Sequence, residues 1–176
     1  MSRLRLIDIG VVGTVVLTMA CTRERQAAAA QQSDPCPARL ATFDTLDFEI
    51  FSNQRWDRFS ESHAADITVH WPDGHETKGL PRHIEDLKAM FVYAPDTKIK
   101  DHPVRTCTGD YTAVMGVMTG TFSKPMPLGN GKTAAPTGKS FRLPMATIGH
   151  WTGTVMDHEY LFWDNQAYMQ QIGLAK

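Results

Sequence analysis

The strongest constraint on the fold is a succession of four strand-like segments in the second half of the chain. Each is rich in Thr, Val, Met and aromatic residues, and the segments cover 97–107, 110–123, 138–151 and 154–164. Turn residues follow the first and third of them, at Gly109-Asp110 and Thr152-Gly153. Because these connections are short, the strands are predicted to pair antiparallel in one sheet. The Pro- and Gly-rich stretch 124–136 is predicted to be a long loop at one end of the sheet.

Helices are predicted ahead of these strands. Apolar residues at mostly helical intervals indicate an amphipathic helix over 38–52, entered through Pro37, and a short helix follows at 55–59. The alternation of Ile67, Val69 and Trp71 with polar residues predicts a strand. A further helix carries Ile84, Leu87, Met90 and Phe91 on one face, and a last short helix is expected at 165–171. Helices followed by a run of strands predict an α+β domain, in which one curved sheet wraps its concave face around the helices.

The charge balance limits the classes of function. The 176 residues include 18 Lys and Arg against 19 Asp and Glu, for a net charge of -1. A nucleic-acid-binding domain normally has a basic excess, so no nucleic-acid partner is expected. No apolar run approaches the roughly 18 residues that span a bilayer, which excludes a protein with several membrane spans. One domain is expected at this length.

The first 20 residues have the pattern of an export signal. Arg3 and Arg5 precede an apolar stretch that begins at Ile9 and ends on Ala20, directly before Cys21. This arrangement resembles a bacterial lipoprotein signal, in which a lipid is attached to the cysteine thiol, here Cys21. Residues 21–36 then form a flexible tether, and the protein is a periplasmic or cell-envelope lipoprotein that meets the membrane only through its lipid. An ordinary cleaved signal, an uncleaved anchor and a cytoplasmic protein remain alternatives.

Two further cysteines, Cys36 and Cys107, remain if Cys21 carries a lipid. In an oxidising compartment they could form a disulfide that fastens the end of the tether to the domain. The alternative is two separate thiols, because spacing alone does not determine which cysteines pair.

The order of several short motifs resembles a known family. They are Ala65-Asp-Ile-Thr-Val-His-Trp-Pro-Asp-Gly74, Gly79, Thr119-Gly-Thr-Phe122, Pro136-Thr-Gly-Lys139, Gly153-Thr-Val155, Asp164 and Gln171-Ile-Gly-Leu174. Together they resemble the SnoaL-like polyketide and ester cyclases of the nuclear-transport-factor-like superfamily, over about residues 38 to 174. The resemblance implies a cone-shaped α+β barrel over residues 37–176 with an apolar pocket. It also implies that there is no metal or organic cofactor, and that dimers are common.

The same resemblance implies two catalytic side chains. In the cyclases, a carboxylate near the end of the last strand moves a proton with help from a histidine on the preceding strand. By position these are Asp164 and His150. A base of this kind works when an apolar cavity raises the pKa of its carboxyl group. The alternatives are that Asp164 only caps the helix that follows it, and that His150 is a surface histidine.

Strand alternation predicts which side chains would contact a ligand. Asp164 shares one face of 154–164 with His158, Tyr160 and Phe162, and this mostly apolar face suits a pocket wall. A bulge would change this assignment. Trp71 and Trp56 are expected in the core, where they could also line the cavity.

No metal site is expected from the sequence. His70 and His75 lie on either side of a turn, but they lack a third ligand at a recognisable spacing.

Two functions remain open. The first is a cofactor-free cyclase or isomerase that acts on a hydrophobic ketone or ester. The second is a non-catalytic lipoprotein that binds a small apolar molecule. Either protein could form a homodimer.

Overall fold

The computed structural model describes residues 34–176. The helices are α2 (Cys36–Thr45), which continues as the π-helix η1 (Leu46–Phe51), then the 3-10 helix η2 (Trp56–Glu61), α3 (Leu80–Tyr93) and α4 (Asn165–Gln171). The strands are β1 (His63–His70), β2 (Glu76–Lys78), β3 (Lys98–Ile99), β4 (Val104–Thr108), β5 (Tyr111–Thr121), β6 (Met126–Gly129), β7 (Lys132–Ala134), β8 (Ser140–Thr152) and β9 (Val155–Trp163). None of the helices within residues 34–176 is long and apolar enough to cross a membrane.

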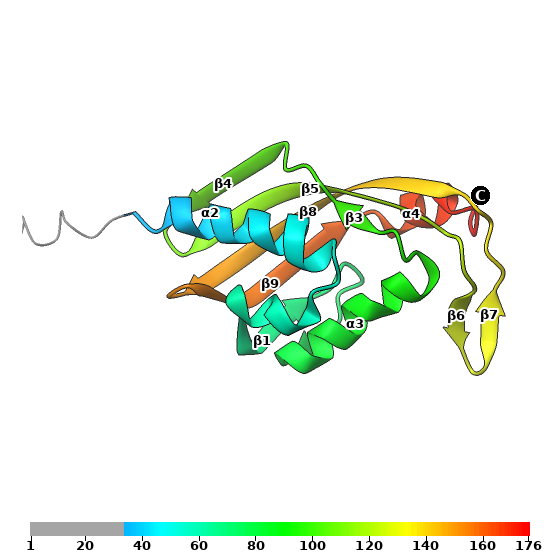
Figure 1. The fold of residues 1–176 in the computed structure, drawn as a ribbon, viewed down its shortest axis with the longest axis horizontal. Helices are drawn as coiled ribbons and strands as arrows, with labels where there is room; N and C mark the ends of the chain where they lie inside the picture. Colours follow the sequence, from blue (N-terminus) through cyan, green and yellow to red (C-terminus); the bar gives the residue numbers. More distant parts are fainter. Residues whose placement is uncertain (1–33) are drawn as a thin grey trace, which may run out of the picture. The chain divides into compact units, whose positions relative to one another are not determined.

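One curved, open sheet organises the domain (Figure 1). Its strand order is β2-β1-β9-β8-β5-β3, and β4 also pairs with β5. Among the described strands only β1 and β9 pair in parallel, and the long connection between them, which contains α3 and strands β2 to β8, makes this possible. The N-terminal helices and α3 pack on the concave face, where their apolar side chains form a single core with those of the sheet. The predicted α+β fold class is therefore confirmed, with a sheet that stays unclosed.

The predicted helix over 38–52 corresponds to α2 and η1, which together run from Cys36 to Phe51. The change to π-helical winding is visible in the amide of Ser52, which donates to the carbonyl of Asp47 at 3.2 Å, and that of Arg55, which donates to Ile50 at 2.8 Å. Short π-helical segments occur frequently at functional sites.

Two predicted segments differ from the structure. The strand expected over 97–107 is interrupted, because residues 100–103 bulge out of the regular pairing with β5 between β3 and β4, although the carbonyl of Asp101 still accepts from the amide of Val117 at 3.3 Å. The stretch 124–136, predicted to be a loop, contains the hairpin of β6 and β7. Its turn includes Asn130-Gly131, and both residues have positive φ, of 48° and 72°. Asn-Gly is the preferred sequence for such a tight turn, so local turn chemistry outweighed the high Pro and Gly content.

A bulge in β9 determines which of its side chains enter the core. The pairing with β8 passes from Trp151–Met156 to His150–His158, and this leaves Asp157 as an extra residue. Met156 and Glu159 therefore both point inward and are almost fully buried. Gly149 allows this arrangement, since a Cβ atom at this position would collide with the sulfur of Met156.

A disulfide joins Cys36, the first residue of α2, to Cys107 in β4, with their Cα atoms 5.5 Å apart. Of the two alternatives that the sequence left open, the structure has the disulfide. Nearby, Arg39 in α2 donates to the carbonyl of Gly109 at 2.6 Å and pairs with Asp110 at 3.0 Å. The start of α2 is thereby held at two points on β4 and the turn that follows it. The signal segment 1–20, the lipidation site Cys21 and nearly all of the tether lie outside the described residues.

Candidate functional site

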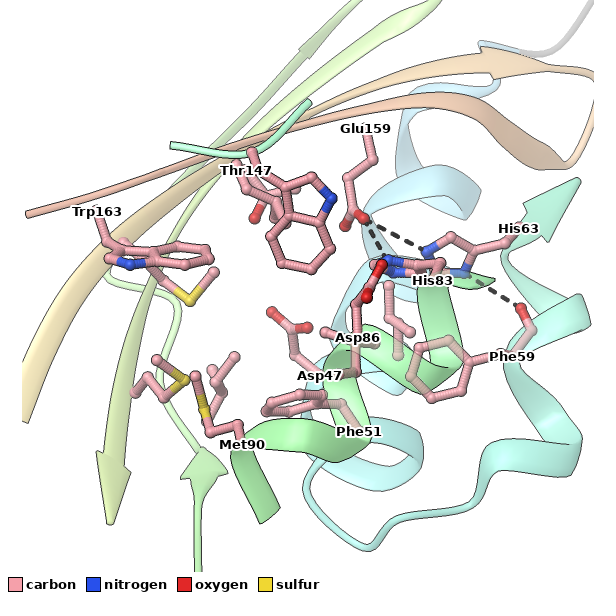
Figure 2. A pocket seen from close by; sticks show the side chains of 17 residues that line it. Asp47, Phe51, Phe59, His63, His83, Asp86, Met90, Thr147, Glu159 and Trp163 are labelled. Atoms are coloured by element: carbon pink, nitrogen blue, oxygen red, sulfur yellow. Dashed lines mark hydrogen bonds and ion pairs between the residues drawn. The ribbon is translucent and has the colours of Figure 1, made fainter. Parts of the chain in front are cut away.

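A cavity lies between the concave face of the sheet and the helices (Figure 2). The volume of the cavity is about 90 Å³. Most of its wall is apolar, as expected for a small-molecule site. The lining residues are Leu46, Asp47, Phe51, Phe59, His63, Trp71, His83, Asp86, Leu87, Met90, Ile99, Met118, Met145, Thr147, Glu159, Leu161 and Trp163.

Asp47 is the first of two polar centres in this wall. It lies on η1, and its carboxylate accepts a hydrogen bond from Nε2 of His102 at 2.8 Å. The other ring nitrogen of His102, Nδ1, donates to Asp44 at 2.8 Å. Asp44 in turn pairs with Arg105 at the surface. His102 reaches these carboxylates from the bulge that residues 100–103 form between β3 and β4. The chain Asp47–His102–Asp44 thus extends from the cavity to the surface.

Burial and hydrogen bonding shift the pKa values of Asp47 and His102. Burial raises the pKa of Asp47 above its ordinary value of 3.8, even though its hydrogen bond and charge interaction with His102 act in the opposite direction. Burial alone would lower the pKa of His102, but its bonds to Asp47 and Asp44 outweigh this and raise it. Asp47 is therefore a carboxyl group whose proton affinity is increased inside an apolar cavity, which is the property of a general acid or base.

Glu159, His63 and His83 form the second polar centre. Figure 2 shows Glu159 reaching from β9 toward both imidazoles. Its Oε2 atom lies 3.2 Å from Nε2 of His83 and 3.8 Å from Nε2 of His63. All three side chains are buried. The Nδ1 atom of His63 is held by the carbonyl of Phe59 at 3.2 Å and the hydroxyl of Ser62 at 2.9 Å.

The buried Glu159 centre is arranged as an anion beside a neutral imidazole. Burial alone would raise the pKa of Glu159, but its interactions with His83 and His63 outweigh this and lower it. Burial lowers the pKa of His83 to about 4, so this imidazole is neutral near pH 7.

Asp164 does not line this cavity. Its carboxylate accepts a hydrogen bond from the amide of Ala167 at 2.9 Å, so it caps α4. It borders only a shallow depression on the outer side of the sheet, together with Phe162. Of the two alternatives for Asp164, the structure has the helix cap, and Asp164 is not among the residues that line the cavity. The physical reason is that the chain turns into α4 at this residue and uses the carboxylate for the helix terminus.

His150 and the predicted ligand-contacting residues of β9 lie on the outer face of the sheet. His150 pairs with Asp157 at 2.5 Å, and His158 lies 3.3 Å from His70. Tyr160 stacks on His70 with ring centroids 4.1 Å apart, and Phe162 is 51% exposed. The face of β9 that lines the cavity is the opposite one, which carries Glu159, Leu161 and Trp163.

The two predicted tryptophans differ in position. Trp71 lines the cavity, and its indole N–H donates to Thr77 at 2.9 Å. Trp56 lies behind the wall, where it packs on Phe59 and Phe91 with centroid separations of 5.5 and 5.4 Å. Asp47, His63, His83 and Glu159 were not singled out as site residues from the sequence. Glu159 alone had a usable signal, as a carboxylate on an otherwise largely apolar strand face.

The chain is similar in sequence and in structure to known proteins. The sequence matches the family model of the SnoaL-like polyketide cyclases over residues 43–172. No curated protein shows a significant match. A structure described as a SnoaL-like polyketide cyclase, from Jannaschia sp. CCS1, has a TM-score of 0.70 at 19% identity, over 83% of this chain and 99% of its own. IdmH, described as a polyketide cyclase from Streptomyces antibioticus, has a TM-score of 0.66 at 21% identity, over 77% and 98%.

A third similar structure extends the comparison beyond the cyclases. It is a protein of ketosteroid isomerase-like fold from Catenulispora acidiphila in complex with trimethylamine, with a TM-score of 0.59 at 14% identity, over 77% of this chain and 92% of its own. The three structural similarities, all below 25% sequence identity, establish a common fold. The match to the family model covers residues 43–172, which is most of the domain, and it establishes the family. The chain belongs to the SnoaL-like polyketide cyclase family.

Proposed function

We propose that the cavity catalyses acid/base chemistry next to a carbonyl group, as in an aldol cyclisation or an isomerisation, on a hydrophobic ketone or ester. The observation that carries the proposal is Asp47, a carboxyl group with a raised pKa in an apolar wall, hydrogen-bonded to His102. Family membership supports cyclase-like chemistry in general. Proton transfer in this proposal is carried out by the protein's own side chains.

In the proposed reaction, the Asp47 carboxylate removes a proton from the carbon next to the substrate carbonyl. The electron pair of the broken C–H bond moves to the carbonyl oxygen and forms an enolate. In a cyclisation, the enolate carbon attacks a second carbonyl of the same molecule, and the proton held by Asp47 passes to the resulting alkoxide. The hydroxyl of Thr147, which also lines the cavity, can donate to the enolate oxygen.

The cavity limits the size of the reacting group. A cavity volume of about 90 Å³ suits a small ring or one end of a larger molecule. Its apolar wall favours a substrate without charge at the reacting end.

Deuterium exchange tests the proposal without knowledge of the natural substrate. Small cyclic ketones and β-keto esters are incubated with the protein in D₂O, and loss of the α-proton signal is followed by NMR. We expect exchange faster than in buffer alone for at least one compound. Saturable binding of these compounds with no exchange would instead support the second function considered, that of a protein that binds a small apolar molecule.

The pH dependence of the exchange provides a more specific prediction. Asp47 acts as a base only when it is deprotonated, so the rate is expected to rise with pH through the pKa of this group. Because burial raises that pKa, the midpoint of the acidic limb should lie above the ordinary aspartate value of 3.8. Initial rates between pH 3 and 8 measure it. A midpoint at or below 3.8 would contradict the assignment of Asp47.

We further propose that the protein functions outside the cytoplasm as a lipoprotein attached through Cys21. The Cys36–Cys107 disulfide supports an oxidising compartment. When the full chain is expressed in a Gram-negative host, we expect it in the membrane fraction, with an N-terminal peptide whose mass includes a lipid on Cys21. The Cys21→Ser variant is the control and should lose both properties. Recovery of the unmodified chain from the cytoplasm would rule out this localisation.

A further inference from the structure

We propose that His63, His83 and Glu159 bind one divalent transition-metal ion in the wall of the cavity. The proposal goes beyond the proton transfer assigned to Asp47, and neither depends on the other. The three side chains come from separate elements, β1, α3 and β9, and converge on one point (Figure 2). Within residues 34–176 they are the only group of three or more such side chains whose candidate ligand atoms all lie close together, within 4.8 Å of one another.

The cluster is buried, and some of its polar atoms lack hydrogen-bond partners. Side-chain exposures are 0% for His63, 2% for His83 and 7% for Glu159. Nε2 of His63, Nδ1 of His83 and Oε2 of Glu159 have no hydrogen-bond partner of good geometry, although Oε2 lies 3.2 Å from Nε2 of His83. A buried polar atom without a partner costs free energy and calls for an explanation, such as an ion.

The bonds of His63 show why a cation would fit. In one tautomer of His63, Nδ1 carries the proton and donates to the carbonyl oxygen of Phe59, 3.2 Å away, which can only accept. If the ring is neutral, Nε2 is then unprotonated and its lone pair faces Oε2 of Glu159 at 3.8 Å. Metal-binding histidines are commonly oriented in this way, with the second nitrogen donating to a backbone carbonyl. A shared cation would satisfy both facing acceptors, and so would a proton on Nε2. The experiment below separates the two cases.

Two of the three distances between the candidate ligand atoms are close to those in a coordination sphere, and all three atoms lie within 4.8 Å of one another. Zinc–ligand bonds of roughly 2.0–2.2 Å at tetrahedral angles place ligand atoms about 3.3–3.5 Å apart. Oε2 of Glu159 lies 3.2 Å from Nε2 of His83 and 3.8 Å from that of His63. Two imidazoles and one carboxylate are a recognised set for Zn²⁺, and also for Fe²⁺. Such three-ligand sites leave a coordination position open, and here that position could face the cavity.

Metal titration of the full chain tests the site directly. The protein is stripped with a chelator, dialysed and titrated with ZnCl₂ by calorimetry, and a second sample is titrated with Co²⁺ and followed by visible absorption. We expect one Zn²⁺ per chain and Co²⁺ bands typical of four or five ligands. The Glu159→Gln and His63→Gln variants should each weaken Zn²⁺ binding by about 100-fold or more, because even changes to residues around a ligand cost 10–100-fold.

Two controls make the result specific. The double variant His70→Gln with His158→Gln removes a pair of imidazoles 3.3 Å apart on the outer face, and it should bind Zn²⁺ like the parent. Asp47→Asn should also bind Zn²⁺ normally, which separates failure of this proposal from failure of the proposed catalysis. If the parent shows no saturable binding, or if only the outer-face variant loses it, the site is ruled out. Should Glu159→Gln fail to fold, the parent and the outer-face variant still decide.

Discussion

Replacing Asp47 by asparagine is expected to lower the rate of enzyme-catalysed α-proton exchange by about 10²–10⁴-fold, the usual contribution of a general base. The amide has nearly the same shape as the carboxyl group and can still accept the hydrogen bond from His102. It cannot take up the substrate proton. The measurement is the exchange rate at saturating ketone for parent and variant, at a pH above the acidic limb.

The same substitution at Asp164 is a matched control. Asp164→Asn should leave the exchange rate within about twofold of the parent. Asp164 caps α4 outside the cavity, and asparagine is an equally good helix cap. A reversed result, with Asp164→Asn inactive and Asp47→Asn active, would return the catalytic role to the position that the family resemblance implies.

Removing the disulfide is expected to lower the free energy of unfolding by about 4 kcal/mol. The bond joins residues 71 positions apart, and closing a loop of this length restricts the unfolded chain considerably. Urea unfolding compares the parent with the double variant Cys36→Ser and Cys107→Ser. Cys21→Ser should leave the unfolding free energy unchanged, because Cys21 is not part of the bond. A difference below about 1 kcal/mol between parent and double variant would show that the disulfide contributes little.

The helices and most strands could be predicted from the sequence because hydrophobic periodicity reports burial directly. The helix over 38–52, the strand pattern after residue 110 and the final helix all reflect this. The family resemblance added the pocket. Periodicity does not show how strands pair, so the break at residues 100–103 and the hairpin of β6 and β7 were missed.

The candidate site was harder to predict, because two of its features depend on pairing. The bulge at Asp157 changes the alternation in β9, so that Met156 and Glu159 face the same interior. Strand alternation counted without the bulge places Met156 on the face of Asp164 and Asp157 on that of Glu159, which makes the outer face look the more apolar of the two. Likewise, Asp47 looks like one of the solvent-facing acids of an amphipathic helix. Only the contact with His102, 55 residues further along the chain, shows that it is part of a buried network.

The attachment of Cys36 to β4 also has a mechanical consequence. A pulling force applied to the chain ahead of Cys36 would pass at that residue across the disulfide into β4, which is paired along its whole length with β5. The α2 helix, which continues into η1 with Asp47, would bear little of the load. Tension on the N-terminal segment would therefore leave the geometry of the cavity largely unchanged.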